Sequence, residues 1–139
     1  MKVLIIHGPN MNLLGKYSDK KVTLDKLNRS IRRHSQKINL NVKIYQTHDQ
    51  KKFLSLLHSN RNKVDGFIIN LGAWHPIAYV FRETLHILNL PYYIVEHLSD
   101  HIEDHNALLE LSVFDSKYII KNEDVENAYL DALNKISSK

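Results

Sequence analysis

The residues best suited to chemistry stand where short apolar runs of the chain end. Asn10 follows the first run, within the stretch 7–15 that reads HGPNMNLLG, and Asn70 directly follows the third run. His97 comes after the fourth. Asparagine amides donate and accept hydrogen bonds, and histidine exchanges protons near neutral pH, so these residue types suit a polar ligand and acid–base work on it. Asparagine also forms turns, and turn formation alone would account for one such residue.

The stretch 7–15 also occupies the place of a glycine-rich phosphate-binding loop, which follows a strand in the same way. Such a loop leads directly into a helix and contains a Gly-Lys-Ser/Thr sequence. No helix is predicted directly after Gly15, and Lys16 and Tyr17 follow it instead. We therefore expect no phosphate loop at this position.

Five short runs rich in β-branched and aromatic residues must position these side chains. The runs lie at 3–6, 42–45, 67–69, 92–95 and 118–120. They alternate with segments of helical period, which is typical of βαβ units and a parallel sheet. Because the runs show little polar alternation, both faces of each strand are expected to be covered. The pattern predicts an α/β fold of the flavodoxin-like, doubly wound type, with a five-stranded parallel sheet and helices on both faces.

Four segments repeat their apolar residues with the period of a helix, and all four stripes are expected to be core. The first stripe is Leu24, Leu27, Ile31 and Ile38, with Thr23 as the predicted N-cap. The second is Phe53, Leu56 and Leu57, and the third is Ile77, Val80, Phe81, Thr84, Leu85 and Leu88. The fourth is Val125, Ala128, Tyr129, Ala132, Leu133 and Ile136, in a helix predicted to open at Asn122 with Glu123 and Asp124 in its first turn.

Ligands of doubly wound sheets bind beyond the carboxyl ends of the strands, where the strand order reverses. In this chain those ends lead into the loops at 7–22, 70–76 and 97–105. We therefore expect the three loops, although far apart in the sequence, to lie in one region of space.

The composition is that of an ordinary globular protein. The chain has 139 residues, 43% apolar and 24% charged, so we expect one domain over residues 1–139. There is no cysteine, which excludes disulfides and thiolate metal sites. The first apolar run is too short for a signal peptide or a membrane span, so we expect a cytoplasmic protein with no membrane partner. The net charge of +4 suits a small anion, but without interleaved aromatic residues it does not indicate nucleic-acid binding.

Several phrases, in the right order, resemble the type II 3-dehydroquinate dehydratases. They are GPNMNLLG at 8–15, QT at 46–47, DGFIINLGA at 65–73, RE at 82–83 and HLS at 97–99. The resemblance implies the flavodoxin-like fold and a hydro-lyase that converts 3-dehydroquinate to 3-dehydroshikimate through an enolate. It implies no metal and no organic cofactor. Members of the family form trimers that often assemble into dodecamers, so we expect a homo-oligomer.

The resemblance assigns roles to individual residues. Asn10 matches the asparagine that helps to hold a water on the enolate side, and His97 matches the general acid for the departing hydroxyl. Asn70 matches the asparagine that contacts the substrate hydroxyls. Leu98 and Ser99 match the positions that bind the substrate carboxylate through backbone and hydroxyl groups.

A metal site is the competing interpretation of the histidines near residue 100. His97, His101 and His105 recur every fourth residue, a spacing that on a continuous helix would place possible metal ligands along one face. The resemblance places His97 in a loop, and the neighbouring Asp100 and Glu103 are ordinary loop and helix-start residues. We therefore expect no metal.

The positions that carry the rest of the family's chemistry are altered. The family's lid holds a catalytic tyrosine and an arginine, whereas the lid at 16–22 contains no arginine, and its only tyrosine, Tyr17, is out of register. The lid is also shorter by about three residues, a change that surface loops tolerate better than catalytic ones. Pro76 stands where the family has a substrate-binding histidine, and His75 lies one position earlier. Glu83 replaces an aspartate that the family contributes to a neighbouring subunit's site.

The arginine expected downstream of the general acid is missing as well, since Leu108 occupies its place and residues 98–139 contain no arginine. These losses predict dehydratase activity that is weak or lost, with Tyr17 as the candidate replacement base. The alternative is a non-catalytic protein of the same kind that binds a small polyhydroxylated carboxylate. A third hypothesis is an enzyme with altered chemistry in the same pocket.

Overall fold

Five parallel strands form one sheet in the order β2-β1-β3-β4-β5. The computed structural model describes residues 1–17, 22–97 and 112–139. The strands are β1 (Lys2–His7), β2 (Asn41–Gln46), β3 (Gly66–Ile69), β4 (Tyr92–Val95) and β5 (Ile119–Ile120). Every strand pair is parallel, so the predicted five-stranded parallel sheet is confirmed. The last strand is one residue shorter than predicted, because Tyr118 belongs to the 3-10 turn η3 (Ser116–Tyr118).

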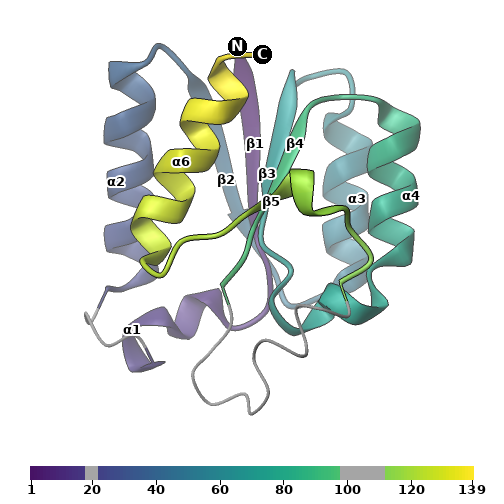
Figure 1. Ribbon diagram of the computed structural model, residues 1–139, viewed down its shortest axis with the longest axis horizontal. Coiled ribbons are helices and arrows are strands. Elements are labelled where there is room, and N and C mark those ends of the chain that lie inside the picture. The colour runs from purple at the N-terminus through teal and green to yellow at the C-terminus, as the bar shows by residue number, and fades with distance from the viewer. Residues whose placement is uncertain (18–21, 98–111) are drawn as a thin grey trace.

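Helices cover both faces of the sheet, also as predicted (Figure 1). One face carries α2 (Leu24–Lys37) and α6 (Val125–Ser137), and the other carries α3 (Gln50–Asn60) and α4 (Tyr79–Leu88). Three short elements lie beyond the carboxyl ends of the strands: η1 (Met11–Leu13), α1 (Leu14–Tyr17) and η2 (Gly72–Ile77). No helix in the described part of the chain is both long and apolar enough to cross a membrane.

Strand β1 supplies side chains to both halves of the core. Val3 and Ile5 pack with α2 and α6, whereas Leu4 and Ile6 pack with α3 and α4. All four are at most 1% exposed, because β1 lies between β2 and β3 and both of its faces are covered by helices. This explains why the run shows no polar alternation. Burying four such side chains contributes about 1.5–3 kcal/mol each, so β1 is the centre of the fold.

Two helix starts follow from local hydrogen bonds. The Thr23 hydroxyl accepts the backbone N–H of Lys26 at 3.2 Å, so the predicted cap of α2 is confirmed. The predicted start of α6 at Asn122 is wrong, because the helix begins at Val125. The Asn122 side chain instead accepts the backbone N–H of Asp124 at 2.9 Å and forms a turn before the helix. All six residues of the predicted α6 stripe are buried.

The third predicted core stripe is only partly buried. In α4, Phe81, Thr84 and Leu85 are buried in the core of the protein. Ile77 and Val80, in contrast, are 62% and 57% exposed. Ile77 lies in the 3-10 turn η2, so it does not follow the 3.6-residue period of the helix. Val80 precedes the buried stripe by one residue and is rotated away from the sheet. The outer side of α4 therefore presents apolar side chains to its surroundings.

Candidate functional site

The carboxyl ends of β1 and β3 are adjacent, at the point where the strand order reverses. The loops that follow them touch. A Cβ placed on Gly8 would lie 2.3 Å from the backbone oxygen of Asn70, so no residue with a side chain fits there without moving the backbone. Gly72 has a φ of +51°, which favours glycine, and its Cβ position lies 3.6 Å from the Pro9 ring. The predicted meeting of these loops is thus observed for their described parts.

Asn70 lies at this switch point, the position beyond the carboxyl ends of β1 and β3 that serves as the ligand crevice in doubly wound sheets. Its backbone N–H donates to the Ile6 oxygen at 3.0 Å, which fixes it to the end of β1. Its side-chain Nδ2 donates to the backbone oxygens of Val95 and His97, at 3.1 and 3.4 Å. The side chain is fully buried, and its Oδ1 accepts no hydrogen bond from the described residues. The amide is therefore held by its nitrogen, while its oxygen is available as an acceptor.

Asn10 follows the end of β1 by three residues. Its φ of 68° is left-handed, a conformation that asparagine tolerates better than most residues. Its backbone oxygen accepts the Leu13 N–H at 2.9 Å, and its own N–H donates to Nδ1 of His48 at 3.4 Å. The side chain is exposed and does not cap η1. The turn is thus built by the backbone, and the side-chain amide is not required for it.

His97 is half-buried and follows β4, and its backbone oxygen is bound by the Asn70 side chain. Asn10, Asn70 and His97 are therefore gathered at neighbouring strand ends, as predicted from three separate parts of the sequence. Glu96, one residue before His97, was not predicted as a site residue. Its Oε2 is buried without a hydrogen-bond donor among the described residues, and nothing in the sequence around the predicted strand end indicates that.

Most of the other predicted site residues lie outside what the structure describes. Tyr17 ends α1 and His75 lies within η2, but their side chains are outside the described part. Leu98 and Ser99 lie outside the described residues altogether, as do His101 and His105 of the metal hypothesis. Glu83 lies on the outer side of α4, where it lines an open hollow of 460 Å³ with Tyr79 and Ile87.

A buried polar trio behind the crevice was not predicted from the sequence. His7 is fully buried, its Nδ1 lies 2.8 Å from the Tyr129 hydroxyl, and its Nε2 lies 2.8 Å from Oδ1 of Asn28. Because Asn28 Oδ1 can only accept, Nε2 carries the proton and Nδ1 accepts from the tyrosine. The trio joins the end of β1 to α2 and α6. The helical period places Tyr129 in the apolar stripe of α6, where its hydroxyl is the one feature that distinguishes it from the apolar residues of the stripe.

The electrostatics of the trio favour neutral histidine. Burial lowers the pKa of the His7 imidazole from 6.5 to about 4, and the hydrogen bond to Asn28 offsets part of that effect. The Tyr129 ring also packs edge-on against the His7 ring, with centroids 5.2 Å apart. His7 therefore acts as a neutral, doubly hydrogen-bonded support for the strand end.

Comparisons with known proteins bear on the family and on the fold. The sequence profile described as Dehydroquinase class II matches residues 1–134. The 3-dehydroquinate dehydratase of Caldanaerobacter subterraneus is 32% identical over 93 residues, and that of Thermotoga maritima is 36% identical over 95 residues. The crystal structure of a type II dehydroquinase from Butyrivibrio crossotus has a TM-score of 0.83, at 23% identity, covering 98% of this chain and 97% of that one.

The fold and the crevice at the β1–β3 switch define a flavodoxin-like α/β protein. Within that class, the match over nearly the whole sequence shows that this chain belongs to the class II dehydroquinase family. The likeness to the Butyrivibrio crossotus structure concerns the fold alone. The aligned stretches span 63% and 64% of the two dehydratases, which is less than two thirds of their length, and 65% and 66% of this chain.

The buried trio predicts a pH dependence of stability. The folded pKa of His7, about 4, lies below its unfolded value of 6.5, so the unfolded state binds more protons between these pH values. The contribution is fully present above pH 6.5 and is lost as the pH falls towards 4. We expect it to amount to about 3 kcal/mol, from 1.36 kcal/mol per pKa unit. Urea unfolding at several pH values measures it.

A His7→Gln variant, which does not titrate, provides the control for that series. The variant is expected to be less stable at pH 7, because it disturbs two buried hydrogen bonds, but its stability should fall less between pH 6.5 and 4. Equal slopes for parent and variant would show that His7 does not titrate in this way.

Proposed function

We propose that the crevice between the ends of β1 and β3 binds a small polyhydroxylated carboxylate of the 3-dehydroquinate type, and that its dehydratase activity is weak or lost. The observation that carries the binding half is the buried Asn70 oxygen, which has no hydrogen-bond donor among the described residues. A buried acceptor of this kind costs about 1–3 kcal/mol, and a ligand hydroxyl would remove that cost. The relatives named 3-dehydroquinate dehydratase support the choice of ligand.

The retained residues fit part of the dehydration chemistry. Removal of water from a hydroxy ketone through an enolate needs a base for the carbon-bound proton, a stabiliser for the enolate oxygen and an acid for the leaving hydroxyl. In this proposal His97 is the acid, Asn10 holds a water beside the enolate, and Asn70 accepts a hydrogen bond from a substrate hydroxyl. Leu98 and Ser99 would bind the carboxylate, with His75 near the hydroxyls.

The base is the missing component. An ordinary tyrosine has a pKa of about 10 and is almost wholly protonated at neutral pH, so it needs a nearby cation to become a base. Tyr17 has lysines but no arginine within the lid, and flexible ammonium groups organise a phenolate less well than a planar guanidinium. The lid is also short. A Cβ on Gly15 would lie 3.0 Å from the Thr23 methyl group, so the two residues that flank the lid lie close together.

A homo-oligomer is part of the same proposal. Three large side chains on the outer side of α4 are strongly exposed: Tyr79 at 64%, Val80 at 57% and Ile87 at 72%. Tyr79 and Ile87 line the same hollow as Glu83, the residue that stands where the family contributes an acid to a neighbouring site, together with Arg82 and His86. Large exposed apolar side chains next to charged residues suit contact with a second copy of the chain. In a trimer or dodecamer, Glu83 would then complete the crevice of the adjacent subunit.

The first test is turnover. Purified protein mixed with 3-dehydroquinate is followed by the ultraviolet absorbance of the conjugated product, beside a type II dehydroquinase that has the complete lid. We expect a rate at least about a thousandfold lower, in keeping with loss of a general base. Robust turnover in the parent would refute the lost-base account. Turnover that Tyr17→Phe abolishes would show instead that the base has moved within the lid, and His97→Ala tests the acid.

The second test is ligand affinity measured by calorimetry. Asn70→Ala is expected to weaken 3-dehydroquinate binding by about tenfold, because one hydrogen bond to a buried acceptor is lost. The matched control is Ser35→Ala, another buried polar residue that bonds a backbone oxygen, but within α2. The control should lose stability and keep its affinity. No binding by the parent, or equal losses in the two variants, contradicts the proposal.

The third test is the state of assembly. Sedimentation velocity at micromolar concentration should show a homo-oligomer, and Ile87→Lys should shift it towards monomer, because a charge would replace an apolar contact. Asn127→Lys introduces the same charge on the exposed side of α6 and should leave the assembly intact. A monomeric parent would count against the α4 contact.

A further inference from the structure

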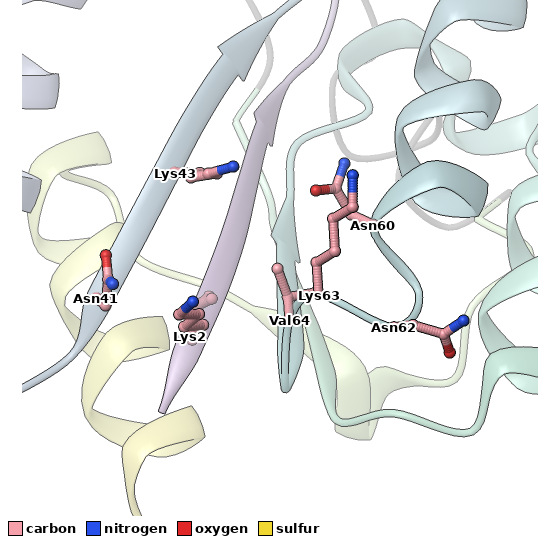
Figure 2. Close-up of a pocket in the computed structure, with 8 residues that line it drawn as sticks. Lys2, Asn41, Lys43, Asn60, Asn62, Lys63 and Val64 are labelled. Atoms are coloured by element: carbon pink, nitrogen blue, oxygen red, sulfur yellow. The ribbon is translucent and has the colours of Figure 1, made fainter.

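A second hollow lies at the opposite, amino edge of the sheet, with a volume of 330 Å³ (Figure 2). Its polar lining consists of three lysines and three asparagines: Lys2, Lys43, Lys63, Asn41, Asn60 and Asn62. No carboxylate and no aromatic side chain is among the described residues that line it. This edge is remote from the crevice, since Lys2 begins the strand that His7 ends.

The hollow follows from the position of β2 at the edge of the sheet. Helix α3 packs over Leu4 of β1 through Phe53 and Leu57. Lys43 pairs with Leu4 and Asn41 pairs with Lys2, so these residues point to the α3 side, and on β2 they remain exposed. Strand spacing places Lys2 and Lys43, two residues out of register on adjacent strands, about 8 Å apart.

All the charged side chains that line the hollow are positive. Lys2 comes from β1, Lys43 from β2 and Lys63 from the turn between α3 and β3, and Figure 2 shows Lys43 pointing towards the side where Lys63 and Asn60 lie. The neighbouring carboxylate of Asp65 accepts the backbone N–H of Lys2 at 2.7 Å and does not line the hollow. Three ammonium groups repel one another within a screening length, and an anion placed among them would relieve that repulsion.

Asn60 adds an acceptor to these donors. It is 6% exposed, and its Nδ2 donates to the Leu56 oxygen at 2.9 Å and lies 3.4 Å from the Ser59 hydroxyl. The amide nitrogen is therefore occupied, and Figure 2 shows the oxygen turned towards β1 and Lys43. An amide oxygen does not bind an anionic oxygen, but it accepts a hydroxyl hydrogen. With no aromatic side chain in the lining, there is no surface on which a nucleobase would stack.

We propose that the amino-edge hollow binds a small anion that also carries hydroxyl groups, of the sugar-phosphate class, with the three lysines on the phosphate and Asn60 on a hydroxyl. The site is distinct from the crevice and does not depend on the proposed dehydratase chemistry. Its volume lies at the lower end of small-molecule pockets, which fits a ligand of a few carbons.

The test is a calorimetric titration of the full chain with glycerol 3-phosphate, inorganic phosphate and glycerol. We expect saturable binding of glycerol 3-phosphate at low salt, tighter than either simpler probe. Lys43→Gln and Lys63→Gln should each weaken it about fivefold, in line with partly exposed ion pairs. Lys135→Gln, an exposed lysine of α6, makes the same charge change elsewhere and should have no effect. Asn70→Ala should also keep this affinity.

The amide contact has its own test. Asn60→Ala should reduce the affinity for glycerol 3-phosphate and leave that for inorganic phosphate unchanged, because only the former has alcohol hydroxyls that can reach the amide oxygen while its phosphate contacts the lysines. Absence of saturable binding overturns the proposal. So does an equal loss in the Lys43, Lys63 and Lys135 variants, which would indicate attraction to net charge alone. Phosphate binding as tight as that of glycerol 3-phosphate overturns the assignment of the ligand class.

Discussion

The backbone of Gly8 passes the carbonyl of Asn70 so closely that no side chain fits between them. This contact joins the carboxyl ends of β1 and β3 at the point where the strand order reverses. Asn70 is then held from both sides, by the backbone oxygen of Ile6 in β1 and by those of Val95, at the end of β4, and His97. The binding surface is thus an extension of the central strands, with the rigidity of the core beneath it.

Attachment to the strand ends also distinguishes the family positions that this chain retains from the lid positions that are altered. Asn10, Asn70 and the backbone of His97 are fixed by strand ends, so the packing of the core preserves their positions. His7 reinforces them from behind through α2 and α6. The lid at 16–22, by contrast, is bounded by Gly15 and Thr23, which lie close together, and surface loops tolerate changes of sequence at little cost to stability. The proposed loss of the lid chemistry, with retention of the residues at the strand ends, would therefore cost the fold little stability.

The parts of the structure that follow a repeated sequence pattern could be predicted from the sequence. The sheet, the two helix layers, the Thr23 cap and the buried stripe of α6 follow from periodicity and local hydrogen bonding. Prediction failed where a pattern is interrupted. Val80 looked like core, but only tertiary packing decides which side of α4 faces the sheet. Periodicity does not encode contacts between residues far apart in the chain. The pairing of the Tyr129 hydroxyl with His7 depends on such contacts, and so does the side-chain oxygen of Asn70, which has no donor among the described residues.

Proton NMR of 3-dehydroquinate in deuterated buffer, with and without the protein, tests the central claim most directly. A crevice that binds without a base predicts broadened ligand signals at substoichiometric protein. It also predicts that deuterium enters the carbon next to the ketone no faster than in the free compound. Accelerated exchange at that carbon would show that the chain removes the proton and has a functional base. Ligand signals that stay sharp would show that the crevice does not bind this acid.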